Sequence, residues 1–189
     1  DDHRVQNTII YPGAGYIEMA LAVAAETGTP GQLAGITFHK ALPLAAATAD
    51  QASAPHFQVL LAGDTVNIYS QAQTGIEGVV PTWTHHATST LGQQSHTPPV
   101  ISEPLSLDAL RNHLGQPLDL PQTYGLFRAL GLNYGPTFQG ITQLWQTSGE
   151  ALAKIQLHED VIKDQADYQL HPVLLDLCLQ TFLGVMAAD

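Results

Sequence analysis

Three short segments of the sequence carry side chains that could transfer protons. In the first, His3 precedes Pro12 and Gly13. Proline suits the first position of a helix, where its missing N–H group is not needed. Glycine leaves the backbone N–H groups of a helix start open to a ligand, and these groups stabilise negative charge. An imidazole beside such a helix start is suited to removing a proton from a carbon next to a carbonyl group. The alternative interpretation is a polar histidine in an ordinary loop.

A carboxyl group near the C-terminus is the second candidate. Asp176 lies between Leu175 and Leu177, and an acid among so many apolar neighbours is costly unless it is partnered or functional. Gln180 follows four residues later, so it shares a helix face with Asp176 and could orient the carboxyl. A carboxyl in an apolar site can stay protonated and act as an acid. A single polar stripe on an amphipathic helix is the other interpretation.

The third candidate is a tyrosine on a tight turn. Tyr134 is followed directly by Gly135 and Pro136, which favour a turn and would hold the hydroxyl as a hydrogen-bond donor. An ordinary turn anchored by its tyrosine explains the same residues equally simply.

Two long apolar helices are expected to position these groups, one over 12–26 and one over 171–187, because apolar residues recur there at helical spacing. A connector rich in Gly, Gln, Ser and Pro is predicted over 92–121. One helix followed by a run of strands, in each half of the chain, indicates an α+β fold. Strands are predicted over 33–44, 57–61, 66–70, 83–91, 138–147 and 151–157, and short helices over 105–114 and 122–131. Hairpins are predicted around 62–65 and 148–149. In the strand over 83–91, His85 and Ala87 are expected to alternate with His86 and Thr88.

Together the three segments resemble the dehydratase domains of modular type I polyketide synthases. That family has the motifs His-x-x-x-Gly-x-x-x-x-Pro, Tyr-Gly-Pro and Asp-x-x-x-Gln/His in this order. In this sequence they fall on His3 to Pro12, on Tyr134 to Pro136 and on Asp176 to Gln180. Asn7 stands where the first motif has glycine. Asparagine tolerates a left-handed backbone better than most residues, so the turn is expected to form.

The resemblance implies a double hotdog fold, in which two antiparallel sheets each wrap a central helix. We expect a first hotdog subdomain over 1–95, a Pro-rich linker over 96–120 and a second hotdog subdomain over 121–189. The strands that the family has before the His motif and after the Asp helix are not found in the sequence, so the fold is expected to be truncated at both ends. Such a fragment is expected to be unstable or prone to aggregation, because it exposes apolar surface and open strand edges.

The implied activity is dehydration of a 3-hydroxyacyl thioester, carried on the phosphopantetheine arm of an acyl carrier protein, to an enoyl thioester. By resemblance, His3 is the base and Asp176 the acid. Gly13 stabilises the thioester oxygen, while Gln180, Tyr134 and Pro12 orient or enclose the reacting groups. No metal or organic cofactor is expected, since the thioester itself acidifies the carbon. The implied partners are the acyl carrier protein and neighbouring synthase domains, with a homodimer in the full synthase.

Three other interpretations remain open. A cyclase or isomerase of the same fold, either pyran-forming or of the product-template type, would use the same His and Asp. A catalytically silent scaffold domain of the synthase would be consistent with Asn7. A metal-binding protein is suggested by the count of nine histidines, but their spacing resembles no ligand set, and His85 and His86 are predicted to point to opposite faces of a strand.

Composition and charge limit the classes of partner. The formal net charge is −11, with six Lys and Arg, so no nucleic-acid partner is expected. No apolar stretch approaches the roughly 18–20 residues of a membrane span, so no membrane association is expected. The single cysteine, Cys178, is predicted to be a small buried helix residue. We expect a cytoplasmic location.

Overall fold

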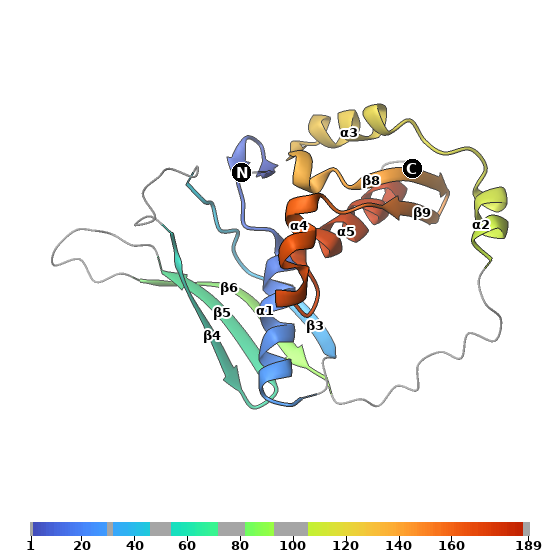
Figure 1. The fold of residues 1–189 in the computed structure, drawn as a ribbon. Helices are drawn as coiled ribbons and strands as arrows, with labels where there is room; N and C mark the ends of the chain where they lie inside the picture. The colour runs from blue at the N-terminus through green and yellow to red at the C-terminus, as the bar shows by residue number, and fades with distance from the viewer. Residues whose placement is uncertain (1, 30–31, 46–53, 72–81, 93–105, 187–189) are drawn as a thin grey trace.

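The structure, a computed structural model, describes residues 2–29, 32–45, 54–71, 82–92 and 106–186. Two long helices organise it. Helix α1 (Gly13–Glu26) lies against a four-stranded sheet, and α5 (Pro172–Met186) lies beside a two-stranded hairpin and also contacts α1 (Figure 1). The predicted α+β fold is confirmed, as are the two predicted long helices to within a residue at each end. Pro12 caps α1 instead of forming its first residue.

The four-stranded sheet is antiparallel throughout, with the order β3-β6-β5-β4. Strands β4 and β5 form the hairpin that the sequence predicts around residues 62–65. The predicted strand over 33–44 ends earlier, at Phe38. The four strands are β3 (Leu33–Phe38), β4 (His56–Ala62), β5 (Thr65–Gln71) and β6 (Trp83–Leu91).

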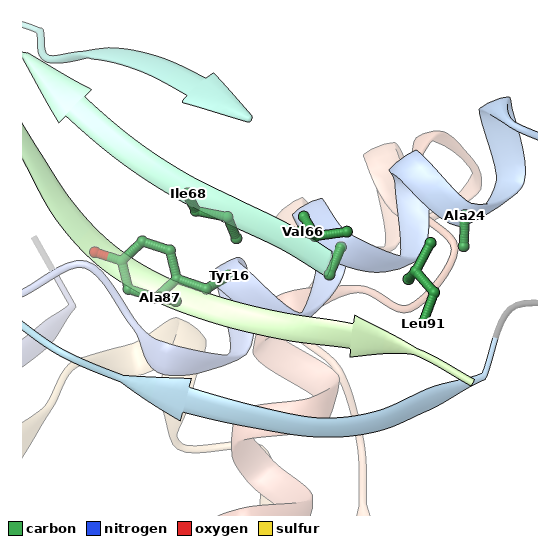
Figure 2. Packing of buried hydrophobic residues seen from close by; sticks show 7 residues of the cluster. Tyr16, Ala24, Val66, Ile68, Ala87 and Leu91 are labelled. Atoms are coloured by element: carbon green, nitrogen blue, oxygen red, sulfur yellow. The ribbon is translucent and has the colours of Figure 1, made fainter. Parts of the chain in front are cut away.

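Small residues of α1 allow this sheet to pack closely against the helix. Ala20 and Ala24 are fully buried, and they meet branched side chains of β5 together with residues of β6 (Figure 2). Burial of each branched side chain contributes about 1.5–3 kcal/mol. The buried members of this core are Tyr16, Ala20, Ala24, Val66, Ile68, Ala87 and Leu91.

A β-bulge in β6 changes the predicted alternation of its side chains. Ile68 pairs with Ala87 and Tyr69 pairs with His85, so His86 is the extra residue between them. As a result His86 and Ala87 are both buried, and the predicted alternation of His85 and Ala87 against His86 and Thr88 is wrong at this point.

The second half of the chain contains the hairpin β8–β9 and the helices around it. The hairpin is confirmed, but β8 begins three residues later than predicted because residues 136–138 form a short 3₁₀ helix. Helix α4 is not anticipated from the sequence. The bounds are α2 (Leu107–Leu114), α3 (Leu120–Ala129), β8 (Ile141–Thr147), β9 (Glu150–Ile155) and α4 (Glu159–Asp164).

A third sheet joins the two halves of the described chain. Strand β1 (His3–Val5) pairs with β2 (Thr8–Ile9) on one side and with β7 (Leu132–Tyr134) on the other. Gln6 and Asn7 make the turn between β1 and β2 with φ values of 48° and 68°. Asn7 therefore does adopt the left-handed backbone expected of it. None of these three strands is predicted from the sequence, because each is too short for a periodic pattern.

Helix α5 buries only one of its faces. Leu177 and Gln180 are fully buried, whereas Leu179 and Phe182 are 46% and 62% exposed. Cys178 lies on the exposed side. The prediction of a buried cysteine is therefore wrong, since neighbouring helix positions differ by about 100° in direction. Among the described helices, none is both long and apolar enough to cross a membrane.

Candidate active site

The histidine of the first motif lies on β1, directly opposite Tyr134 of β7. The Nδ1 atom of His3 is 2.9 Å from the backbone oxygen of Ile10. A carbonyl oxygen only accepts hydrogen bonds, so this contact assigns the ring proton to Nδ1 in the neutral imidazole. The Nε2 atom of His3 then carries a free lone pair, as a general base requires.

Two aromatic rings hold the His3 imidazole in place. The ring of Phe138 lies 5.4 Å from it and the ring of Tyr134 lies 5.7 Å from it, both centroid to centroid. The two aromatic rings stack on each other at 6.4 Å. Sequence reasoning did not identify Phe138, which lies two residues beyond the Tyr-Gly-Pro motif.

The predicted base faces the predicted acid. His3 Nε2 is 3.8 Å from Asp176 Oδ1, and both side chains are largely buried, at 14% and 10% exposure. The two residues come from opposite ends of the described chain. They meet because β1 pairs with β7 of the second half, and the short 3₁₀ helix over 136–138 that follows β7 contacts α5.

Burial raises the pKa of the Asp176 carboxyl, while the hydrogen bond from Gln180 and the proximity of His3 oppose that rise. The rise prevails because the carboxylate form loses more solvation than these neighbours restore. Asp176 therefore keeps its proton to higher pH than a free carboxyl group does, which suits a general acid.

Gln180 orients the acid as the i, i+4 spacing predicts. Its Nε2 atom donates to Asp176 Oδ2 at 2.9 Å and to the backbone oxygen of Phe138 at 3.0 Å. The Gln180 side chain is fully buried. Oδ2 of Asp176 is thus engaged, and Oδ1 is the atom that faces His3.

Tyr134 contributes a phenol that stays protonated. Its burial, together with the charge of Asp176 and its neighbour Tyr124, raises its pKa well above the ordinary value. At neutral pH Tyr134 is therefore a hydrogen-bond donor beside His3.

The second motif also anchors β1. Asp2 accepts hydrogen bonds from the backbone N–H of Thr137 at 3.1 Å and from its hydroxyl at 2.8 Å, and the Gly135 N–H donates to the backbone oxygen of Asp2 at 2.7 Å. A Cβ on Gly135 would collide with the Asp2 side chain. The glycine of this motif therefore allows the segment that carries His3 to approach. Sequence reasoning missed Asp2, because nothing links it to residue 137 before the strands pair.

Pro12 and Gly13 lie at the start of α1, as predicted. The contacts of His3 and Asp176 described above do not include either residue. Gly13 instead lines a cavity of about 260 Å³, and Pro12 lines a second cavity of about 350 Å³. A Cβ on Gly13 would lie 3.3 Å from the ring of Phe38. The first N–H groups of a helix have no partner within the helix, so Gly13 presents a donor at the cavity wall.

Among the described residues, the structure offers no candidate site for a metal ion. Within the described part of the chain, no three His, Cys, Asp or Glu side chains are grouped so as to hold a metal ion. His86 instead bonds Ser70 Oγ at 2.7 Å and the backbone oxygen of Lys40 at 2.8 Å, while His39 and His85 both contact Thr88.

The geometry of the pair suits elimination of a group from adjacent carbons. A base and an acid at the 3.8 Å separation of His3 and Asp176 can act on neighbouring carbons from the same face, the base removing a proton and the acid protonating a leaving oxygen. The low exposure of both side chains excludes bulk water and strengthens their electrostatic interaction with a substrate.

Comparison with protein families places the chain in one group. The model for the polyketide synthase dehydratase domain matches residues 1–70, and the model for the polyketide synthase dehydratase N-terminal domain matches residues 102–189. Polyketide synthase GfsE of Streptomyces halstedii is 34% identical over 96% of this chain. Mycoketide-CoA synthase of Mycobacterium tuberculosis is 29% identical over 94%. The chain spans only 5% and 4% of these two relatives.

Solved structures agree with this assignment. The dehydratase domain from the CurK module of curacin polyketide synthase is 31% identical, with a TM-score of 0.72 over 95% of this chain. The dehydratase domain of a mycocerosic acid synthase-like polyketide synthase is 26% identical, with a TM-score of 0.75 over 98%. The chain covers 61% and 62% of these domains, so its fold is a truncated double hotdog, as expected.

Proposed function

Because this chain belongs to the dehydratase domains of polyketide synthases, we propose that it carries the catalytic pair of a domain that dehydrates a 3-hydroxyacyl thioester to an enoyl thioester. The observation that carries the proposal is the buried contact between His3 Nε2 and Asp176 Oδ1 at 3.8 Å. One partner has a free lone pair, and the raised pKa of the other favours its protonated form.

In the proposed reaction, Nε2 of His3 removes a proton from C2 of the substrate. Asp176 donates its proton to the C3 hydroxyl, which leaves as water while the C2–C3 double bond forms. His3 ends protonated and Asp176 ends ionised. Return of the proton from His3 to Asp176 restores both groups.

The other motif residues support this chemistry. The N–H of Gly13 at the start of α1 stabilises negative charge on the thioester oxygen, since a helix N-terminus favours an anion. Gln180 holds Asp176 through Oδ2, and Tyr134 donates a hydrogen bond toward the reacting hydroxyl. Pro12 forms part of the wall of the cavity of about 350 Å³. No cofactor is required, because the thioester carbonyl stabilises the carbanion that develops at C2.

Variants of a relative support the choice of residues. Two structures of the CurK dehydratase are described as inactive mutants, one with aspartate changed to asparagine and the other with histidine changed to phenylalanine. In that relative the two positions are separated by the same number of residues as His3 and Asp176.

The relatives are multidomain polyketide synthases, so this domain works beside other synthase domains. We propose that its substrate arrives on the phosphopantetheine arm of an acyl carrier protein, and that the full synthase is a cytoplasmic homodimer.

The test uses the complete dehydratase domain and a 3-hydroxyacyl thioester. We expect His3→Phe and Asp176→Asn each to lower turnover by about 10²–10⁴-fold, the usual contribution of a positioned acid or base. His113→Phe and Asp108→Asn, which change exposed residues of α2, are matched controls that should retain activity. Near-native turnover in either site variant would remove the assignment.

Thiol trapping followed by mass measurement separates dehydration from its same-fold alternatives, because the enoyl thioester and its cyclised or isomerised forms have the same mass. Dehydration lowers the substrate mass by one water and leaves a double bond that a thiol can trap. A pyran-forming cyclase consumes that double bond, and an isomerase moves it. A catalytically silent scaffold domain would return the 3-hydroxyacyl thioester unchanged.

A further inference from the structure

The two long helices begin in different ways. Pro12 precedes α1 and provides no side-chain hydrogen bond to its first N–H groups. Helix α5 begins at Pro172, which has no N–H group, and the N–H of Val173 donates to His171 Nδ1 at 3.1 Å. The N–H of Leu175 donates to the backbone oxygen of His171, also at 3.1 Å. His171 therefore caps α5 with both its side chain and its backbone.

The imidazole of His171 is buried and is also held at its other nitrogen. The residue is 7% exposed. Its Nε2 atom lies 3.4 Å from Asp164 Oδ1, and the ring of Tyr168 meets the imidazole edge-on, with 4.6 Å between centroids. A backbone N–H can only donate, so Nδ1 carries no proton, and the neutral ring has its proton on Nε2, toward the carboxylate. Asp164 thus favours the tautomer in which Nδ1 is an acceptor.

The choice of a histidine at this cap is unusual. Ser, Thr, Asp and Asn are the preferred residues, and α2 and α3 are capped by Ser106 and Asp119. An imidazole has a second nitrogen, which allows the cap of α5 to contact Asp164 at the same time. The residue before a proline favours extended backbone, which a capping residue requires. The His171–Pro172 pair therefore specifies where α5 begins.

The start of α5 lies one helical turn before the proposed acid. The buried face of α5 consists of residues at helical spacing: Val173, Asp176, Leu177 and Gln180. The middle of this face is packed closely, since a Cβ on Gly140 would lie 2.7 Å from Leu177. The beginning of the helix is held by the hydrogen bond at Val173. Loss of that bond would therefore loosen the turn that leads to Asp176.

We infer that His171 is a positioning residue for Asp176: as a neutral acceptor of the Val173 N–H, it fixes the start of α5 and so the place of the Asp176 carboxyl opposite His3. This inference rests on the proposed function and adds to it a residue that acts only through the helix. The catalytic pair is sensitive to such support, because a misplacement of about 1 Å can cost about 10² in rate.

The test compares two substitutions of His171 in the complete domain, with a 3-hydroxyacyl thioester as substrate. His171→Leu fills the space of the ring but offers no acceptor. We expect its kcat to fall about tenfold with KM nearly unchanged, because the substrate contacts remain while Asp176 shifts. His171→Asn supplies an oxygen that caps helices well, so its kcat should return to within about threefold of the wild-type value.

His158 provides a matched control. It caps α4 in the same manner, since its Nδ1 atom accepts the N–H of Asp160 at 3.3 Å, and α4 carries neither the proposed acid nor the proposed base. His158→Leu should leave kcat unchanged. Wild-type kcat in His171→Leu overturns the inference, as does an equal loss of kcat in His158→Leu. A loss in His171→Asn as large as that in His171→Leu overturns it as well, because the acceptor would then not be the group that matters.

Amide hydrogen exchange separates positioning from general stability. For His171→Leu we expect faster exchange at Val173 and in the first turn of α5, while α1 and the four-stranded sheet exchange as in the wild type. Faster exchange throughout the domain would show that His171 only stabilises the fold, and the inference would be wrong.

Failure of the proposed function gives a different pattern. If the unmodified domain dehydrates no 3-hydroxyacyl thioester, the proposed function fails, and the place of Asp176 is followed by carbon NMR of its carboxyl group. Burial raises the pKa of this carboxyl. A displaced and better hydrated Asp176 in His171→Leu should therefore titrate at lower pH, and His171→Asn should restore the wild-type titration. An unchanged titration of Asp176 in His171→Leu contradicts the positioning role.

Discussion

At the scale of the residue, hydrogen bonds determine which atoms of the proposed acid and the proposed base face each other. The Nδ1 contact of His3 with Ile10 leaves Nε2 free, and the Gln180 amide occupies Oδ2 of Asp176 so that Oδ1 faces the base. Sequence reasoning identified these three side chains correctly as neighbours. The Ile10 carbonyl could not be recognised, because a backbone oxygen leaves no signature in residue types.

Because Asp176 is buried, the carboxyl group proposed as the acid is also expected to lower the stability of the folded domain at neutral pH. Because the folded-state pKa lies above the ordinary value of 3.8, the folded protein binds more protons than the unfolded chain as pH rises past that value. Stability contributed by this group therefore falls with rising pH, until the pKa of the folded state is passed. We therefore expect Asp176→Asn to increase the free energy of unfolding at pH 7. Each added kcal/mol should raise the melting temperature by about 2–4 °C.

The gain should shrink as the pH is lowered toward the ordinary carboxyl pKa of 3.8, because the wild-type carboxyl then takes up protons in both states. Thermal melts of the complete domain between pH 4 and 8 measure the effect. Asp108→Asn, at a highly exposed position of α2, is the control and should show no such dependence. An Asp176→Asn variant that is less stable than wild type at pH 7 would contradict the assigned direction.

At the scale of the element, the short strand β1 determines the position of His3, the proposed base. It is held by β7 and by the hydrogen bonds that Asp2 makes with Thr137 and Gly135. The Tyr-Gly-Pro segment thus has two structural roles, since it places Tyr134 opposite His3 and clamps the strand on which His3 lies.

We expect Gly135→Ala to displace β1, because the added methyl group would overlap the Asp2 side chain. Turnover should fall by about tenfold or more, since small misplacements of a catalytic group cost up to about 10² in rate. The matched control is Gly125→Ala within α3, where a Cβ meets only an Arg128 side-chain atom at 3.9 Å.

The kcat values of the two variants are compared, and circular dichroism verifies that each variant is folded. A Gly135→Ala domain that is folded and fully active would show that β1 does not need this close approach.

At the scale of the whole molecule, a buried glutamate joins the two central helices. Glu18 of α1 is 7% exposed, and its two carboxylate oxygens accept the backbone N–H groups of Gln169 and Leu170 at 2.8 and 2.7 Å. Those residues precede α5, which carries Asp176. The contact therefore fixes the approach of one half of the molecule to the other.

We expect Glu18→Gln to destabilise the complete domain by about 1–3 kcal/mol, because one buried N–H would face an amide NH₂ group instead of an acceptor. The expected fall in melting temperature is several degrees. Glu26→Gln, at an exposed position of the same helix, is the isosteric control and should change stability by less than about 0.5 kcal/mol. Equal melting temperatures for the two variants would show that the hydrogen bonds to Glu18 do not stabilise the domain.

Much of the fold follows from local pattern. The helices α1 and α5 and both hairpins were predicted, because their apolar residues repeat at helix or strand spacing over enough residues to be recognised. The strands β1, β2 and β7 are two or three residues long and were not predicted. The regular alternation around His86 and the burial of Cys178 were predicted wrongly, since both depend on the register and face that packing selects.

The sequence by itself determined the candidate groups for proton transfer: a histidine before a helix start, a tyrosine on a Gly-Pro turn and an aspartate within an apolar helix, all in the order of one family. Only the tertiary structure decided which atoms of these residues face one another, that Phe138 and Asp2 complete their surroundings, and that His171 caps the helix that carries Asp176. The physical reason is that residue type and spacing fix which groups can exchange a proton, whereas their separation depends on strand pairing between distant parts of the chain.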